Sequence, residues 1–171
     1  SFGNAVVKKF LNSKTYSEVR IFSRDESKQD RMAQEYNNSK LSFYLGDVRD
    51  EERIKHVSKG VDVIFHAAAL KIVPSCENAT WETIKTNIIG SKNVIEAAIS
   101  NKIKNLTLLS TDKSVYPVNT MGMTKALVEK MALSVDFPDK TNINCVRYGN
   151  VLYSRGSVIP LFVNQILQNK D

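Results

Sequence analysis

LTLLSTDKSVYPVNTMGMTKALVEK, residues 106–130, is the stretch around which the rest of this chain can be arranged. Its first four residues form a mainly apolar run, which is typical of a buried strand. Asp112 and Lys113 stand side by side where that strand gives way to a loop, and Pro117 indicates a turn after them. The stretch therefore predicts a strand, a loop with an acid beside an amine, and a turn.

The segment after this turn has helical spacing, so Met121 and Lys125 would share one face of a helix, with Lys130 further along. A carboxyl group and amines at the carboxyl end of one strand are the parts of a proton-transfer site. The same residues also fit a salt-bridged loop that caps a helix. The positions of the other polar residues in the chain decide between these two interpretations.

The composition is ordinary for a soluble globular protein. The 171 residues are about the length of one domain, and 42% of them are hydrophobic and 25% charged. No apolar run approaches the roughly 18 residues that cross a bilayer, and no signal peptide opens the sequence. We therefore expect a cytoplasmic protein.

Charge and cysteine usage narrow the class of ligand. The net charge of +6 suits an anionic ligand, but the lysines are scattered, so we expect a solvated basic surface and no nucleic-acid binding. Cys76 and Cys145 lie far apart without CxxC spacing, which predicts free thiols and no metal site.

The two ends of the sequence are typical of an internal segment. The chain starts in SFGNAVVKKFL without an initiator Met, and it stops at Asp171 just after a helical pattern. We expect a fragment that lacks a first strand and a C-terminal substrate-binding part.

Helix and strand patterns alternate along the whole chain. Helical patterns cover residues 6–11, 25–37, 50–58, 81–101, 121–133 and 158–167, and strand patterns cover residues 18–23, 41–45, 61–65, 106–109 and 143–148. This alternation fits right-handed crossovers in a parallel sheet. We predict a single partial α/β domain over residues 1–171 with a doubly wound, Rossmann-like parallel sheet.

The polar residues favour a binding site at one edge of this sheet. In doubly wound sheets ligands sit beyond the carboxyl ends of the strands. The candidate polar residues follow the predicted strands at Ser23 and Arg24, Asp47, residues 66–71, residues 110–113 and residues 148–150. Charges that were merely solvated would not be confined to one edge, so a site is the better interpretation.

The start of the chain carries weak signs of a dinucleotide. Gly3 would let a helix N-terminus approach a pyrophosphate, although it fits a simple N-terminal turn equally well. About 20 residues further on, a carboxylate would hold the ribose of NAD, whereas a basic residue suits the 2′-phosphate of NADP. Ser23 and Arg24 come first here, with Lys28 one turn later, which favours NADP and leaves NAD as the alternative.

The end of the predicted strand 41–45 offers an adenine contact. Asp47 could accept a hydrogen bond from the adenine amino group, with Val48 packing on the ring. Alternatively, Asp47 caps the helix that follows it.

Seven motifs together resemble the extended short-chain dehydrogenase/reductases. They are SFGN, IFSRDESKQD, GDVRD, HAAALKIVPSCE, KTNIIGSKNVIEAA, LSTDKSVYPVNTMGMTK and RYGNVLYSRGSVIPLF. Within that superfamily they are similar to the CapD/CapE-type polysaccharide-biosynthesis subgroup, whose characterised members include inverting UDP-N-acetylglucosamine 4,6-dehydratases. The resemblance implies an NAD(P)-binding Rossmann-like domain, a UDP-sugar substrate, a role in capsule or other surface polysaccharide, and a homo-oligomer when full length. In some relatives a membrane-spanning region precedes this part of the chain.

One position departs from the superfamily pattern. The tyrosine expected four residues before the lysine is replaced by Met121, whereas Lys125 is retained. Methionine cannot transfer a proton, although Met at this position is familiar in the subgroup. The base that starts the oxidation at C4 is therefore open among Lys125, Lys113, Asp112 and Tyr116.

The resemblance also implies roles in the elimination of water from a UDP-sugar. Lys113 would remove the C5 proton and Asp112 would protonate the departing C6 hydroxyl. Lys125 would hold the nicotinamide ribose, and Thr111 would bond the C4 oxygen. An exposed helix position for Lys125 and a backbone-bonded Thr111 are the structural alternatives.

The remaining implied contacts lie on the loops at the same edge. His66 is expected to be structural, and Asn87 supports the active site in the superfamily, although a polar residue inside a helix usually points outward. The implied contacts are Ala67, Ala68 and Tyr148 to the dinucleotide, Lys71 to sugar or nicotinamide, Asn150 to substrate, and Arg155 and Ser157 to the UDP group. The alternative for Arg155 and Ser157 is an ordinary polar loop.

Two other functions compete with a dehydratase. A UDP-hexose 4-epimerase needs the C4 ketone but no acid at C6, so the pair Asp112 and Lys113 argues against it. A regulatory NADP-binding module without chemistry would explain Met121.

Overall fold

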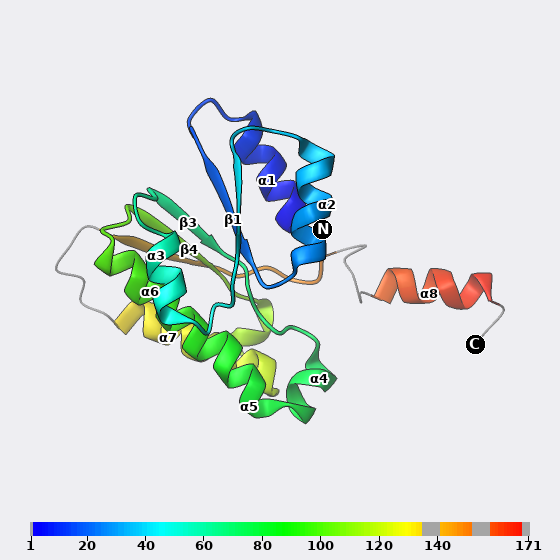
Figure 1. Cartoon of the computed structure of the whole chain (residues 1–171). Coiled ribbons are helices and arrows are strands. Elements are labelled where there is room, and N and C mark those ends of the chain that lie inside the picture. The colour runs from blue at the N-terminus through cyan, green and yellow to red at the C-terminus, as the bar shows by residue number, and fades with distance from the viewer. Residues whose placement is uncertain (1, 135–140, 152–157, 169–171) are drawn as a thin grey trace.

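The computed structural model describes residues 2–134, 141–151 and 158–168 (Figure 1). Their elements, in chain order, are α1 (Phe2–Asn12), β1 (Val19–Ser23), α2 (Glu26–Tyr36), β2 (Leu41–Leu45), α3 (Glu51–Val57), β3 (Val63–His66), α4 (Val73–Asn78), α5 (Thr80–Thr83), the π-helix η1 (Ile84–Ile89), α6 (Gly90–Ser100), β4 (Asn105–Leu109), the 3₁₀-helix η2 (Asp112–Ser114), α7 (Thr120–Ser134), β5 (Asn142–Val146) and α8 (Val158–Leu167). The predicted alternation of strands and helices is confirmed.

The strands pair in parallel, as expected for crossover connections. β1 pairs with β2, and β3, β4 and β5 follow in that order, with Leu106 opposite both Ile64 and Ile143. Within the described residues these are two sheets, because no ladder joins β1 to β3. In the common doubly wound order, strands in these two places flank one further strand.

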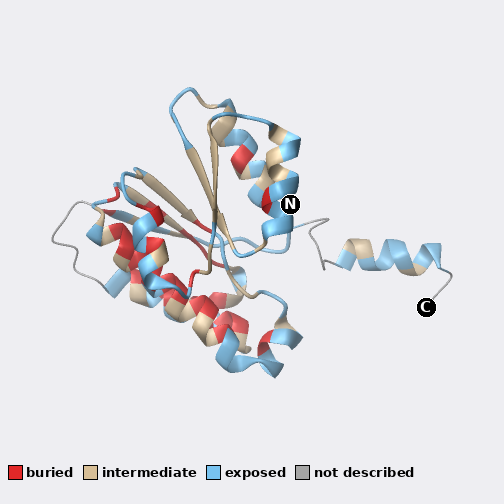
Figure 2. Cartoon of the chain, in the orientation of Figure 1, coloured by how far each residue is buried: buried red, intermediate tan, exposed pale blue. Residues whose placement is uncertain are grey.

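The core lies between β4 and the helices α6 and α7. Leu106, Leu108 and Ile103 are almost fully buried and pack with apolar side chains of both helices. Figure 2 shows most of the buried residues gathered around β4, α6 and α7. Each buried leucine contributes about 1.5–3 kcal/mol by leaving water, so β4 is firmly held at the point where the site begins.

The long helix predicted over residues 81–101 is divided by a π-helical segment. α5, η1 and α6 follow one another without a loop. Gly90 opens α6 where it passes the β2–α3 loop, and a Cβ there would lie 2.7 Å from Cγ2 of Val48. This close approach anchors Val48 in the core.

Carboxylate caps define the starts of α2 and α3. Asp25 accepts from the backbone N–H of Lys28 at 3.0 Å, and Asp50 accepts from that of Arg53 at 2.9 Å. Such caps stabilise a helix by about 1 kcal/mol each. Because Asp50 is the cap, the alternative that gave this role to Asp47 is wrong.

Two findings concern the helices. In the described part of the chain, none is both long and apolar enough to cross a membrane. The last helix, α8, carries apolar side chains that are mostly exposed, among them Leu161, Phe162 and Ile166.

Candidate active site

The centre of the site is the turn formed by residues 110–114, directly after β4. Two backbone bonds carry the pairing of β4 and β5 beyond the strand ends: Ser110 N–H donates to the Val146 carbonyl at 2.8 Å, and Asp112 N–H donates to that of Tyr148 at 3.0 Å. The turn is therefore fixed beside residues 148–150, as the shared edge of parallel strands predicts.

The acid and the amine of this turn lie together. Lys113 Nζ is 3.1 Å from Asp112 Oδ1 and 3.2 Å from Oδ1 of Asn150. The Thr111 hydroxyl donates to Asp112 Oδ1 at 2.9 Å. Sequence reasoning placed these four residues at one rim, and the structure links them in a chain of hydrogen bonds that runs from Thr111 through Asp112 and Lys113 to Asn150.

Hydrogen bonds and charge determine the ionisation of this cluster. The Thr111 hydroxyl, and after it the Lys113 ammonium, hold the pKa of Asp112 below its usual range. The side chains of Lys113 and Asp112 are 36% and 54% exposed. While the two side chains are exposed to solvent, the pair consists of a carboxylate and an ammonium.

Lys125 lies one layer deeper, on α7. Only 7% of the residue is exposed, and its Nζ donates to the Leu109 carbonyl at 2.7 Å. Burial lowers the pKa of Lys125 to about 8. The alternative of an exposed helix lysine is therefore wrong.

Met121 occupies the helix position one turn before Lys125. It is buried, at 6% exposure, whereas Tyr116 is 85% exposed. The thioether has no proton to transfer. In this structure the titratable groups that stand together at the rim are Asp112 and Lys113.

Asn87 is brought inward by the π-helix η1. Its Oδ1 accepts from Leu70 N–H at 2.8 Å, and its Nδ2 donates to the Leu70 carbonyl at 3.0 Å and to Thr124 Oγ1 at 3.1 Å. Asn87 is fully buried, so the expectation that a helix asparagine points outward is wrong here. π-Helical turns are frequent at functional sites. This one ties the loop after β3 to α7 beside Lys125.

The ends of β1 and β2 form the predicted dinucleotide edge. Ser23 Oγ accepts from Gln29 Nε2 at 3.2 Å, and the same amide donates to the Tyr44 carbonyl at 2.9 Å. Arg24 lies 3.5 Å from Asp47 across the two strand ends. Sequence reasoning missed Gln29, a polar residue on α2 that fixes Ser23 and joins the two strands.

Charged neighbours surround the other predicted nucleotide contacts. Lys28 pairs with Asp25, and Asp47 pairs with Arg49 at 2.7 Å. The Arg49 side chain holds the pKa of Asp47 below its usual range, so Asp47 is an ionised acceptor. Such an acceptor fits the adenine amino group that was predicted for it.

Val48 differs from its prediction. It is 8% exposed and belongs to the core, with its side chain against Gly90. Little of its surface is left for an adenine ring, because close packing of the helix fills that side. The predicted ring contact of Val48 is therefore corrected to a core contact.

The loop after β3 contributes small and structural residues. Ala67 and Ala68 are exposed at the strand end, and Lys71 is exposed further along the loop. His66 is buried with Nε2 3.0 Å from Ser91 Oγ, and burial lowers the pKa of this imidazole to about 3. The burial and the contact with Ser91 agree with the prediction of a structural histidine.

A ring contact between Phe2 and Tyr148 brings the start of α1, which contains Gly3, to the same edge of the sheet. The Phe2 ring stacks on that of Tyr148 with centroids 6.0 Å apart, so the start of α1 lies beside the residues after β5. Gly3 is already inside α1, and a Cβ there would meet nothing within 4 Å. Tyr148 remains 40% exposed.

Some predictions fall elsewhere. Arg155 and Ser157 lie outside the described residues. Across residues 2–134, 141–151 and 158–168, no group of three or more His, Cys, Asp or Glu side chains could hold a metal ion.

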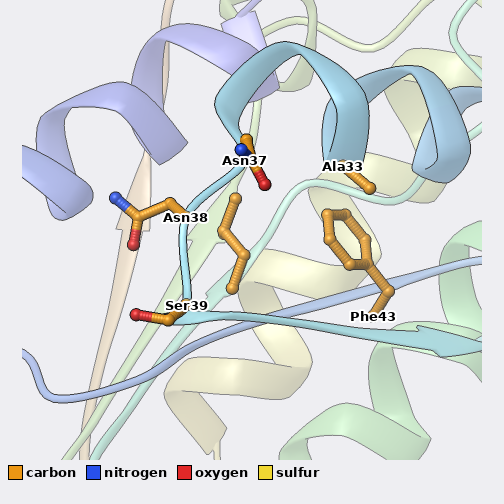
Figure 3. A pocket seen from close by; sticks show the side chains of 6 residues that line it. Ala33, Asn37, Asn38, Ser39 and Phe43 are labelled. Carbon is orange, nitrogen blue, oxygen red and sulfur yellow. The ribbon is translucent and has the colours of Figure 1, made fainter.

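A hollow of about 470 Å³ lies at the amino end of β2, away from the predicted edge (Figure 3). It is lined by Ala33, Asn37, Asn38, Ser39, Leu41 and Phe43.

The residues at the carboxyl edge fit a nicotinamide dinucleotide. Ser23 Oγ accepts from the backbone N–H of Asp25 and from Gln29 Nε2, so its own proton is left for a ligand oxygen. Arg24 adds a half-exposed guanidinium, and Asp47 an ionised acceptor. The exposed Ala67 and Ala68 leave room beside β3.

Comparison with known proteins decides the family. The family model described as polysaccharide biosynthesis protein matches residues 1–171. The chain belongs to this family. A UDP-glucose 4-epimerase of Rickettsia bellii is 55% identical over 177 residues, which cover 100% of this chain and 52% of that protein. This family member therefore spans about half the length of the curated relatives it matches.

Solved structures confirm the predicted fold. The X-ray structure of Pen from Bacillus thuringiensis has a TM-score of 0.93 and 38% identity, and the match covers 98% of this chain and 52% of that one. A double mutant of DesIV, a dTDP-glucose 4,6-dehydratase of Streptomyces venezuelae, with NAD bound has a TM-score of 0.85 at 20% identity, and the match covers 98% of this chain and 59% of that one. This family member thus has the Rossmann-like fold of these two structures.

Proposed function

We propose that this family member is a UDP-sugar 4,6-dehydratase of the UDP-N-acetylglucosamine type that inverts C5, uses NADP and supplies surface-polysaccharide synthesis. The observation that carries the proposal is the cluster of Thr111, Asp112, Lys113 and Asn150 at the carboxyl ends of β4 and β5. The cluster offers an acid and a base 3.1 Å apart at an open rim. An elimination that removes a proton from one carbon atom and protonates the hydroxyl group on the next needs such a pair.

The dinucleotide would lie along the ends of β1, β2 and β3. A bound nicotinamide supplies the hydride acceptor and donor that make a transient C4 ketone possible. Ser23 and Arg24 would hold the 2′-phosphate, which a guanidinium can bind through two donors. Asp47 would accept the adenine amino group, and Lys125 would donate to the nicotinamide ribose.

The elimination itself assigns one proton to each member of the pair. Lys113 Nζ takes the C5 proton, whose acidity the C4 ketone raises. The electron pair of that bond forms the C5–C6 double bond, and the C6–O bond breaks. Asp112 gives its proton to the departing oxygen, and one water leaves. At the end of this step Lys113 has gained a proton and Asp112 has lost one.

This assignment needs a neutral amine and a protonated carboxyl group. The protons are then placed the opposite way from the ionised pair that is exposed to solvent. One proton moving from Lys113 to Asp112 along their 3.1 Å contact produces both forms at once. Withdrawal from water favours the neutral pair, because desolvation destabilises both charges. A sugar that covers the half-exposed pair would provide this desolvation.

Met121 leaves the C4 hydroxyl proton to another group. Lys125 is engaged with the Leu109 carbonyl, and Tyr116 is exposed to solvent. These two facts favour the Asp112 and Lys113 pair over the other two candidates, and the neutral Lys113 amine would pass the C4 hydroxyl proton on to solvent before it takes the C5 proton.

Product mass tests the proposal. The whole protein is incubated with UDP-N-acetylglucosamine and NADP⁺, and the product is weighed by mass spectrometry. We expect loss of one water, and no such loss with Lys113→Ala or Asp112→Asn. Asp62→Asn is the matched control, because Asp62 forms an exposed pair with Lys104. A dehydrated product formed at the wild-type rate by both variants would remove the catalytic assignment.

A 4-epimerase is the second candidate, favoured by the name of the Rickettsia relative. Its product has the mass of the substrate, so the same measurement separates the two functions. A non-catalytic NADP-binding module would give no product at all. The cytoplasmic location, which the sequence pattern predicts, and the homo-oligomeric state, which the resemblance implies, stay predictions for the whole protein.

A further inference from the structure

Glu129 is a buried carboxylate that the proposed chemistry does not use. It lies on α7 one turn after Lys125, and 6% of it is exposed. Its Oε1 accepts from the hydroxyls of Ser110 and Ser114, the latter at 2.7 Å. Arg147, after β5, binds the carboxylate through Nε at 3.0 and 3.1 Å and through a terminal nitrogen at 2.6 Å.

The two serines bracket the catalytic turn. Ser110 precedes Thr111, and Ser114 follows Lys113. Ser114 Oγ also lies 2.6 Å from the Thr111 carbonyl oxygen, so its single proton is shared between that oxygen and Glu129. The carboxylate thus closes a ring of contacts around the backbone that carries Asp112 and Lys113.

One face of α7 holds this backbone at successive points. Lys125 and Glu129 are four residues apart, so they share a helix face. Lys125 donates to the Leu109 carbonyl, and Glu129 accepts from the adjacent Ser110. Gly122 lets the first turn of the helix touch the other end, because a Cβ there would lie 2.6 Å from the Lys113 carbonyl oxygen.

Arg147 makes the buried charge tolerable. A carboxylate removed from water needs hydrogen bonds and an opposite charge, and the forked contact with a guanidinium supplies both. Arg147 also links Glu129 to the segment after β5 that carries Asn150, the second partner of Lys113. The network therefore reaches both sides of the acid–base pair.

We propose that Glu129 is a positioning residue, which sets where Asp112 and Lys113 stand relative to Lys125 by holding Ser110 and Ser114. The inference rests on the proposed function for its catalytic consequence, but its structural part stands on the contacts alone. Loss of the carboxylate would loosen the turn without removing any group that touches the substrate. A misplacement of about 1 Å can cost roughly 10²-fold in turnover.

The test compares three variants of the whole protein. Glu129→Gln keeps the shape and removes the charge, Glu129→Asp keeps the charge on a shorter side chain, and Glu96→Gln removes a carboxylate from an exposed pair with Lys92. For Glu129→Gln we expect kcat to fall about 10²-fold with KM within about twofold, and partial rescue in Glu129→Asp. Glu96→Gln should match the wild type.

Hydrogen exchange gives a second measurement that needs no turnover. We expect the amides of residues 112–114 to exchange at least about tenfold faster in Glu129→Gln, while those of β4 and α6 keep their protection. Uniformly faster exchange with unchanged kcat per folded molecule would show a purely structural role and overturn the inference. Unchanged exchange in the turn would also overturn it.

The two proposals can fail separately. If the wild-type product has not lost water, the proposed function fails, but the exchange of residues 112–114 still decides the role of Glu129. If water is lost and the Glu129 variants behave as the wild type, only the positioning role fails.

Discussion

Lys125 Nζ donates to the Leu109 carbonyl at 2.7 Å, which joins α7 to the last residue of β4. The contact places a buried amine directly beneath the turn that carries Asp112 and Lys113. The same helix therefore supplies a polar group to the site and holds the strand end in place. Both roles come from a lysine with 7% of its surface exposed.

Lys125→Met should separate stability from function. At pH 7 the folded protein buries an ammonium whose pKa is lowered to about 8, and methionine fills similar space without a charge. We expect the variant to unfold at an equal or higher temperature, with a gain of up to about 3 kcal/mol offset by the loss of one hydrogen bond. Turnover should be lost. Lys130→Met, at an exposed position on the same helix, is the control.

The sign of the pH dependence follows from the same shift. Between about pH 8 and the ordinary value of 10.5, the unfolded chain binds more protons at this lysine than the folded one. Stability of the wild type therefore rises with pH in that window, and Lys125→Met should lack this contribution. Urea titrations at pH 7.5 and 9.5 measure the difference. An identical change in both proteins would contradict the buried amine.

Arg24→Ala tests the choice of dinucleotide. Arg24 stands at the end of β1, within 3.5 Å of Asp47, where a 2′-phosphate would meet it. Because a charge-assisted contact contributes about 1.5–3 kcal/mol, we expect the Kd for NADP to rise about 10- to 100-fold and that for NAD to change less than about threefold. Calorimetric titration of the whole protein measures both. Arg31→Ala on exposed α2 is the control, and equal losses for both dinucleotides would refute the assignment.

Most of the fold could be predicted because it depends on local pattern. The run 106–109 is mainly apolar and short, and the helical spacing after residue 120 continues for four turns, so both elements were found in the right place. The pair Asp112 and Lys113 was found because adjacent residues at a strand end must share its edge. What failed was the continuity of the helix over residues 81–101, since the π-helical turn accompanies contacts of Asn87 with Leu70 and Thr124, which lie far away along the chain.

The supporting residues were missed for the same reason. Glu129 contacts partners 15 to 19 residues away, and Gln29 reaches the Tyr44 carbonyl on another strand. A glutamate or glutamine on a helix normally indicates a solvated face. Only the packing of α7 against β4 and β5, and of α2 against β1 and β2, turns these side chains inward. Val48 was misassigned because Gly90 brings α6 close enough to bury it.

Acid should unfold the wild type partly through Glu129. Hydrogen bonds from Arg147, Ser110 and Ser114 lower its pKa from 4.5 to about 2, against burial, which raises it. The stabilisation is complete above about pH 4.5 and is lost as the pH falls towards 2, an effect of about 3 kcal/mol. The free energy of unfolding of Glu129→Gln should be flatter over that range than that of the wild type, as followed by circular dichroism. Glu96→Gln should follow the wild-type curve.

Gly122→Ala should disturb the contact between α7 and the catalytic turn. The added Cβ would lie 2.6 Å from the Lys113 carbonyl oxygen, a backbone atom that can yield only if the turn moves. We expect a loss of about 1–3 kcal/mol in the free energy of unfolding, together with a fall in kcat that exceeds any change in KM. Gly3→Ala is the control for stability, because a Cβ inside α1 would meet nothing within 4 Å and alanine favours a helix by about 1 kcal/mol over glycine. If Gly122→Ala unfolded like the wild type, α7 and the turn could not be in the contact described, and the positioning of Asp112 and Lys113 by this helix would be wrong.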